Sequence, residues 1–374
     1  MLDSKKSEAN GNVHHHQVDR LRGQIMQLQY RVLMFVTFTC LTFSASADEN
    51  NVADPLFQDD QLLHLNITAP LITLVRKRPK DDYLPGQIEY TESDGNVVKL
   101  DLEIRTRGHN RHENCDYPPL LLNFKKKQTI GTIFANQNKL KLVVHCKKSE
   151  KYEQAVLREY LVYRIFNAVT DMSFRVRLVR VKYINSEKSG KEQERYAFLI
   201  EHKNRLGARF GLNDLKVEKT TVASIQPDSL NLSSVFAFLI GNTDFSPVAG
   251  APNDECCHNY VLFGTDTNTD PIVAIPYDFD QSGFVDAPYA LANEMFRIRT
   301  VRQRVYRGRC ANNEHLEASL KRFSDRRDVI YKLVVEQEGL EPRVRKKLSA
   351  YIEDFYELID DPKDVERKII EECV

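Results

Sequence analysis

The chain has 374 residues, of which 42% are hydrophobic and 9% aromatic, so it is long enough to bury a substantial core. Lysine plus arginine and aspartate plus glutamate each number 53, which gives a formal net charge of zero. This balance offers no basis for expecting a nucleic acid or an anionic membrane surface as a partner.

The N-terminal region carries a pattern typical of a secretory signal peptide. Arg31 precedes an uncharged apolar run, 32–43, and an Ala-x-Ala sequence follows it and ends at Ala47. We therefore expect a leader over residues 1–47, with its start codon left open. An uncleaved anchor is the alternative, but the run is short for a membrane span. The pattern predicts an exported protein, periplasmic or extracellular, with no stable membrane span once the leader is removed.

Six cysteines follow the expected cleavage site, and an even number in an exported chain favours disulfide bonds. There is no Cys-x-x-Cys pair, which disfavours a zinc ribbon or a thioredoxin-like site. Two of the six are adjacent, and since adjacent cysteines rarely bridge each other, we expect them to connect one loop to two other places. The disulfide candidates, whose pairing is left open, are Cys115, Cys146, Cys256, Cys257, Cys310 and Cys373.

The first part of the mature chain is predicted to be mostly β-sheet. Residues 48–62 are polar and acidic, which indicates a mobile lead-in. Alternation of apolar and polar residues then predicts a series of strands, and Asp94-Gly95-Asn96 marks a turn between two of them. The expected strands are residues 63–67, 72–74, 87–90, 100–107, 120–124 and 139–144.

A strong helix is expected over about 152–168, where apolar residues such as Val156 and Ile165 form one stripe at helical spacing. The chain then becomes mainly helical, and we expect an α+β protein divided near 203–211. The N-terminal part would span 63–203 and the C-terminal part 204–374. The remaining expected elements are strands 175–184, 196–201, 260–263 and 272–275 and helices 230–240, 329–336 and 344–359.

Four polar residues, Asp244, Asn259, Asp278 and Asp280, stand at the ends of apolar segments in the C-terminal part. Such residues lie at the rim of a core and face a cleft. Carboxylate and amide oxygens can hold Mg²⁺, and a further carboxylate can orient a hydroxyl group for phosphoryl transfer. Each residue alone is equally suited to cap a helix or a turn. Their order across two short strands favours a metal and phosphate site.

This pattern resembles the spore-coat CotH-like protein kinases and, more distantly, the HipA-like kinases. The resemblance implies a two-lobed protein-kinase-like fold, with a β-rich N-lobe that carries one main helix and a mostly helical C-lobe. It also implies that Asp244 is the catalytic base and that Asn259 and Asp278 hold the metal. Asp280 would support Asp278 or share the metal with it.

The resemblance implies an ATP-binding lysine as well. Lys139 and Lys141 alternate onto the same face of a strand, so either could meet the phosphates, and Lys141 is preferred. Glu159, in the middle of the expected helix, would be its partner. The alternative is a solvated lysine and an exposed glutamate.

Two further segments are assigned by the same resemblance. Arg107 and Gly108 form an Arg-Gly turn whose amides and guanidinium could approach phosphate, although a plain hairpin turn is equally possible. The strand that ends at Glu201 would meet adenine through its backbone. Fourteen residues separate Asp244 from Asn259, more than kinases place there, so this insert must loop out and return.

The sequence thus favours an exported CotH-like atypical kinase that transfers the γ-phosphoryl group of ATP to protein Ser or Thr, with Mg or Mn. One alternative is a catalytically silent kinase-fold protein that acts as an envelope scaffold or binding protein. Another is a metal-dependent phosphoester hydrolase. The expected partner is a protein substrate or an envelope or coat component.

Overall fold

The computed structural model describes residues 53–190, 192–250, 256–265 and 271–374, which belong to one unit of the chain. The expected leader, its cleavage site and the first residues of the expected lead-in lie outside these ranges. Within them, no helix is long and apolar enough to cross a membrane.

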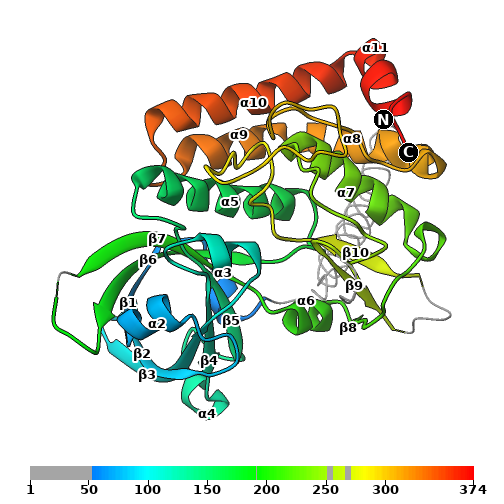
Figure 1. The fold of residues 1–374 in the computed structure, drawn as a ribbon. Coiled ribbons are helices and arrows are strands. Elements are labelled where there is room, and N and C mark those ends of the chain that lie inside the picture. Colours follow the sequence, from blue (N-terminus) through cyan, green and yellow to red (C-terminus); the bar gives the residue numbers. More distant parts are fainter. Residues whose placement is uncertain (1–52, 191, 251–255, 266–270) are drawn as a thin grey trace, which may run out of the picture. The chain divides into compact units, whose positions relative to one another are not determined.

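Seven strands close into a mixed β-barrel (Figure 1). Their order is β1-β2-β3-β4-β5-β7-β6, and every pairing is antiparallel except that of β6 with β1, which closes the barrel. Alternate side chains point inward, so that Ile67, Ile88 and Leu122 are fully buried in the barrel core. The strands are β1 (Leu63–Ala69), β2 (Leu84–Thr91), β3 (Val97–Thr106), β4 (Leu120–Phe124), β5 (Lys139–Val143), β6 (Val176–Asn185) and β7 (Gln193–Ile200).

The two-lobed kinase-like fold expected from the family resemblance is wrong. The structure has instead a closed seven-stranded mixed barrel with helices, and it is 38% helical and 23% strand. Alternation of apolar residues located most strands correctly but contains no information on their distant partners. The closing pair aligns Leu63 with Val179, two residues far apart in the sequence, and this pairing is what the local pattern did not predict.

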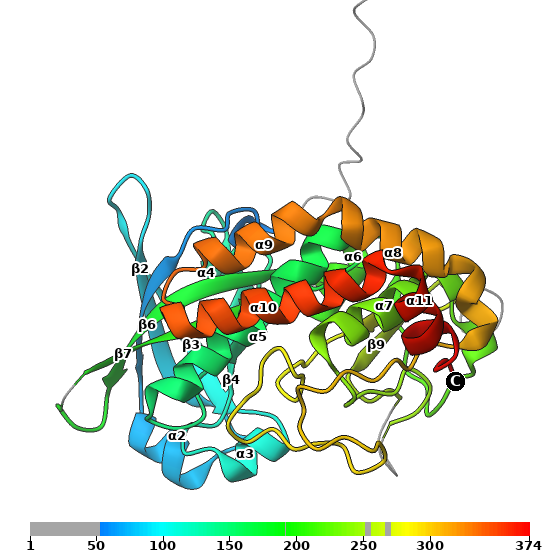
Figure 2. The ribbon, with the colours of Figure 1, turned by 90° about the horizontal axis from the view of Figure 1, so that it is seen from above.

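Short helices accompany the barrel strands. Helix α2 (Leu71–Lys77) lies across one end of the barrel (Figure 2). It contains residues 72–74, which we expected to be a strand, because Leu74 packs into the barrel core and this packing overrides the β-propensity of isoleucine and threonine. The other short helices of this part are η2 (Pro55–Phe57), α3 (Asn110–Asn114) and α4 (Lys126–Thr129).

The strong helix expected after the barrel strands is α5 (Glu150–Val169), in agreement with the apolar stripe. It contacts β6 and β7 on the barrel and α9 (Arg327–Glu336) among the C-terminal helices. Its residues Leu157 and Leu161 are fully buried, since neighbours cover it on more than one side. The helix therefore joins the barrel to the C-terminal part.

The C-terminal part combines helices with a small sheet of order β10-β9-β8. Helix α7 (Pro227–Ile240) is apolar on nearly all faces and is accordingly buried. A single hydrophobic cluster extends from α5 to the last helices, and the division into residues 63–203 and 204–374 stays a prediction. The remaining elements are β8 (Asn213–Asp214), β9 (Tyr260–Gly264), β10 (Val273–Pro276), α6 (Lys203–Arg209), η3 (Val222–Ser224), η4 (Cys310–His315), α8 (Leu316–Asp325), α10 (Pro342–Asp360), α11 (Pro362–Val365) and η5 (Glu366–Ile370).

Within the described ranges the cysteines form three disulfides, Cys115–Cys146, Cys256–Cys257 and Cys310–Cys373. Our expectation that the adjacent Cys256 and Cys257 connect to two different places is wrong. The other four cysteines pair among themselves, with Cα atoms 4.6 and 5.1 Å apart, which leaves the adjacent two for each other. Disulfides are consistent with an exported protein.

Candidate functional site

A cavity of about 720 Å³ lies between β3–β5 of the barrel and the segments around β9 and β10. We refer to it as the charged cavity. Of the catalytic, metal and nucleotide-binding residues predicted from the sequence, Lys139 and Glu201 do not line it. Those that line it are Arg107, Gly108, Lys141, Glu159, Asp244, Asn259, Asp278 and Asp280. Segments widely separated in the sequence thus converge on one space.

Lys141 lies in the middle of β5 and is half-buried, whereas Lys139 on the same strand is exposed. The Lys141 ammonium lies 4.9 Å from the centre of the Tyr277 ring. Burial and the nearby Arg107 lower the pKa of Lys141 to about 8, although Asp278 opposes this shift. Among the described residues, no hydrogen bond or ion pair to this ammonium is found, so it is available to an anionic ligand.

Glu159 lies on α5 and is almost fully buried. Its carboxylate pairs with Arg111 at 3.4 Å rather than with Lys141, the partner expected from the sequence. Burial raises the pKa of Glu159 to about 8, and Arg111 acts against this rise. Arg111 also donates a hydrogen bond to the carbonyl of Val144. Arg111 is thus the ion-pair partner of Glu159.

Asp244 follows the C-terminal end of α7, where Gly241 adopts a left-handed conformation with φ of 62°. His258 Nε2 lies 2.7 Å from Asp244 Oδ1. Asn259 Nδ2 donates to the Asp244 backbone carbonyl at 2.7 Å and to Oδ2 at 3.1 Å. The contact with Asp244 raises the pKa of His258 above its usual value, since a carboxylate stabilises the charged imidazolium. Asp244 is therefore held in place from both sides.

The insert between Asp244 and Asn259 returns as the sequence required. A β-bridge pairs Ser246 with His258, and the Asn259 carbonyl accepts a hydrogen bond from the Tyr277 amide at 3.0 Å. No role was predicted for His258 from the sequence. Its position next to Asn259 is the one feature of the sequence that indicates an approach to Asp244.

Asp278 and Asp280 follow β10 and have different environments. Asp278 has a φ of 62°, unusual for a residue with a side chain, and its amide donates to the Tyr163 hydroxyl at 2.9 Å. No hydrogen bond to its carboxylate is found in the described ranges. Asp280 is buried and accepts a hydrogen bond from Tyr289 at 3.1 Å. Burial and the Asp278 charge raise the pKa of Asp280 to about 7.

The remaining predicted residues divide between the cavity and the surrounding structure. Gly108 has a φ of 90°, which favours glycine, and Arg107 Nε donates to the Leu120 carbonyl at 3.2 Å. Glu201 is buried in a bidentate ion pair with Arg209, with both distances 3.0 Å, and has no contact with the charged cavity. The Glu201 side chain therefore has a packing role, and the expected contact between adenine and the backbone of this strand stays a prediction.

Within the described residues, no group of three or more His, Cys, Asp or Glu side chains is placed to hold a metal ion. Mg²⁺ is commonly bound through only one or two carboxylates together with waters and phosphate oxygens. Asp278 fits a site of that kind, since its carboxylate has no protein hydrogen-bond partner in those ranges and lines a cavity whose wall also contains cationic side chains. Asp280 and Asn259 line the same cavity.

Comparison with known proteins gives no relative: no family model, curated protein or solved structure matches this chain, and none links it to CotH-like or HipA-like kinases.

Proposed function

We propose that the charged cavity binds ATP with Mg²⁺ or Mn²⁺ and transfers the γ-phosphoryl group to a Ser or Thr hydroxyl of a protein. The observation that carries this proposal is that two charged groups of opposite sign, neither of them in an ion pair within the described ranges, line the same cavity. The Lys141 ammonium and the Asp278 carboxylate both line it, and neither has a hydrogen-bond or ion-pair partner among the described residues. Phosphate and its metal require this combination of cation and carboxylate.

Lys141 and Arg107 supply the cationic wall. A pKa of about 8 leaves Lys141 mostly protonated near pH 7, and a phosphate beside it would raise that pKa further. Arg107 uses Nε for the Leu120 carbonyl, which fixes its guanidinium at the cavity wall. These two side chains would orient the phosphate oxygens of the nucleotide.

Asp278 would hold the metal ion, with Asp280 and Asn259 beside it. Bound there, the ion would neutralise charge on the phosphoryl oxygens. Burial raises the pKa of Asp280 to about 7, so a cation in the cavity would favour its ionised form. The contact between Tyr289 and Asp280 orients that carboxylate before a ligand arrives.

Asp244 would accept the proton of the attacking hydroxyl. As the new O–P bond forms, the bond between the γ-phosphorus and its bridging oxygen breaks, and the nucleoside diphosphate leaves. Each carboxylate oxygen of Asp244 receives one hydrogen bond, from His258 or Asn259, and has a second lone pair for the proton. The two contacts hold the base in a fixed orientation.

A catalytically silent binding protein is the second candidate. The observation that favours it is the Glu159–Arg111 pair, because it leaves Lys141 without a carboxylate to fix its position. Such a protein would use the same charged cavity to bind a phosphorylated ligand or an envelope partner without turnover.

The test uses protein secreted by cells that express the full chain. With ATP and Mn²⁺ we expect a rise in the melting temperature and transfer of labelled γ-phosphate to protein Ser or Thr. Asp278→Asn should abolish both effects, whereas the exposed control Asp325→Asn should leave them intact. Stabilisation without transfer would indicate the silent binding protein, and release of free phosphate would indicate a hydrolase. If ATP neither stabilises the protein nor reacts, the proposal is wrong.

A further inference from the structure

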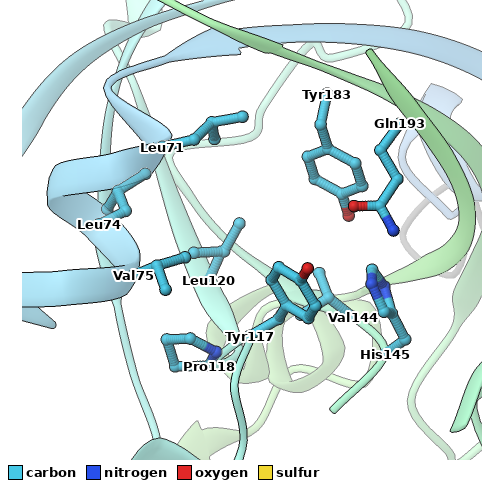
Figure 3. Close-up of a pocket in the computed structure, with 10 residues that line it drawn as sticks. All are labelled: Leu71, Leu74, Val75, Tyr117, Pro118, Leu120, Val144, His145, Tyr183 and Gln193. Atoms are coloured by element: carbon cyan, nitrogen blue, oxygen red, sulfur yellow. The ribbon is translucent and has the colours of Figure 1, made fainter. Parts of the chain in front are cut away.

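A second, smaller cavity of about 80 Å³ lies where α2 covers one end of the barrel (Figure 3). We call it the barrel-end cavity. It shares no lining residue with the charged cavity, so an inference about it does not depend on phosphoryl transfer. The two cavities lie on opposite faces of the chain at β4 and at the end of β5. Leu120 of β4 and Val144, the residue after β5, line this one, whereas Leu121 and Val143 line the charged cavity.

The wall of the barrel-end cavity has an apolar side and a polar side. As Figure 3 shows, Leu71, Leu74 and Val75 project from α2 on one side. On the opposite side lie the Tyr183 hydroxyl and the imidazole of His145. A molecule that fills this space would therefore contact hydrocarbon at one end and polar atoms at the other.

Two polar side chains of this cavity, His145 and Tyr183, have no hydrogen-bond partner among the described residues. His145 is only 3% exposed, and neither of its ring nitrogens makes a hydrogen bond within the part of the chain that the structure describes. The Tyr183 hydroxyl is likewise buried without a partner. Buried polar groups are nearly always hydrogen-bonded, because leaving them unpaired is unfavourable. Both groups therefore indicate a ligand that supplies the missing partners.

Contacts between protein groups hold the wall of the barrel-end cavity in place. The Cys115–Cys146 disulfide lies next to His145, and the Tyr117 amide donates to the Cys146 carbonyl at 3.0 Å. The Tyr117 ring packs on His145 with centroids 4.7 Å apart. These contacts fix the imidazole in place even without a ligand.

The ligand that fits is uncharged. Among the described residues, no Asp, Glu, Lys or Arg lines the barrel-end cavity. Burial lowers the pKa of His145 to about 4, which leaves the imidazole neutral near pH 7. A neutral imidazole offers one donor and one acceptor, and a hydroxyl group can satisfy either. A charged head group would be buried without a counter-ion, at a large free-energy cost.

The volume of the cavity and its entrance further limit the class of ligand that can bind. The volume is roughly half of the ~150 Å³ that accommodates benzene in an engineered cavity, so the ligand end that enters has only a few non-hydrogen atoms. A wider hollow of about 720 Å³ shares Leu71, Val75, Tyr183 and Gln193 with it and forms its entrance.

We propose that the barrel-end cavity binds a small uncharged molecule with a hydroxyl group and a short aliphatic body. The hydroxyl group bonds to His145 and Tyr183, and the aliphatic body packs against Leu71, Leu74 and Val75.

Isobutanol is the probe, with isobutylammonium and isobutyrate as charged comparators of similar shape. Titrations of the full chain are followed through the ¹⁵N resonances of the His145 ring. We expect saturable shifts with isobutanol at a Kd on the order of millimolar, and none with the charged comparators. Tyr183→Phe should weaken binding roughly three- to tenfold. Tyr331→Phe, a tyrosine in α9 whose hydroxyl bonds to Glu353, should leave binding unchanged.

The Tyr183→Phe variant should fold normally, since the hydroxyl it removes has no protein partner, and an unchanged melting temperature checks this. The proposal is overturned if isobutanol gives no saturable shift, or if the charged comparators bind equally well. It is also overturned if Tyr183→Phe binds as tightly as the wild type, or if a soaked crystal shows only ordered water in the cavity.

Discussion

At the scale of single residues, the environment of each side chain separates ligand-binding groups from supporting groups. Among the described residues, the Lys141 ammonium and the Asp278 carboxylate line the charged cavity with no hydrogen-bond or ion-pair partner. By contrast, Glu159, Asp280 and Asp244 are held by Arg111, Tyr289 and the His258–Asn259 pair. The sequence indicated which side chains would meet. It did not indicate which would already be paired, because that depends on a neighbour such as Arg111 from another part of the chain.

The two lysines of β5 allow a matched test. Lys141→Met keeps the length of the side chain but removes its charge, and should weaken ATP binding about tenfold or more, as expected for loss of a charge-assisted contact. Lys139→Met, on the same strand but exposed, should bind ATP like the wild type. Affinities are measured by calorimetry. Equal affinities of the two variants would contradict the assignment of Lys141.

The Lys141→Met variant should also remain folded. Its ammonium makes no ion pair or hydrogen bond among the described residues, and its partial burial already lowers its pKa to about 8. Removing such a charge is not expected to reduce the free energy of unfolding. A marked fall in that free energy would indicate a structural role for Lys141.

At the scale of elements, the site depends on how helices and strands end. Asp244 follows the end of α7, Asp278 follows β10, and Asn259 precedes β9. The sequence placed these ends correctly because apolar runs stop there. It did not predict how the insert before Asn259 returns, since that depends on a bridge between Ser246 and His258.

Gly241, which ends α7, can be tested against Gly211. Both have positive φ, 62° and 65°, so alanine should strain the backbone by about 1 kcal/mol at either position. At Gly241 a Cβ would also lie 2.2 Å from Tyr351 Oη, whereas at Gly211 it would meet nothing within 4 Å. Gly241→Ala should therefore lower the free energy of unfolding more, by about 1–3 kcal/mol beyond Gly211→Ala.

Urea unfolding of the two glycine variants measures this difference. Phosphoryl transfer should also fall in Gly241→Ala, because the segment that carries Asp244 starts at this turn. Similar losses of stability in both variants would show that the space around Gly241 adapts to a methyl group.

At the scale of the whole molecule, closure of the barrel was the feature least accessible to the sequence. Alternating residues identified β1 and β6 as strands, but their parallel pairing joins distant segments, and many other pairings would bury the same apolar faces. The kinase resemblance therefore supplied a set of converging residues but the wrong architecture. Asp244, Asn259 and Asp278 were predictable because each lies next to the end of a recognisable element, whereas Lys141 and Glu159 lie within β5 and α5 and were implied by the resemblance.

The buried carboxyl groups make stability depend on pH. Folding raises the pKa of Glu159 from 4.5 to about 8 and that of Asp280 from 3.8 to about 7, mainly through burial. The folded state thus binds more protons than the unfolded state between those limits, so the free energy of unfolding should fall as the pH rises from about 4 to 8. Below about pH 4 the stabilising effect is fully present.

Glu159→Gln should reduce this dependence, because the amide does not titrate. Between pH 5 and 7.5, a range that lies between the two pKa values of Glu159, we expect the wild type to lose about 3 kcal/mol more stability than the variant, as measured by urea unfolding. The exposed Glu357→Gln serves as the control and should follow the wild type. If Glu159→Gln shows the same slope as the control, the Glu159 carboxyl group is ionised throughout this range.

The two faces of β4 and β5 have a thermodynamic consequence. Leu120 and Val144 contact one cavity, and their neighbours Leu121 and Val143 contact the other. A ligand in one cavity that shifts this part of the backbone therefore also changes the geometry of the other cavity. Linkage then requires reciprocity: the factor by which occupancy of one cavity changes affinity at the other must be the same in both directions.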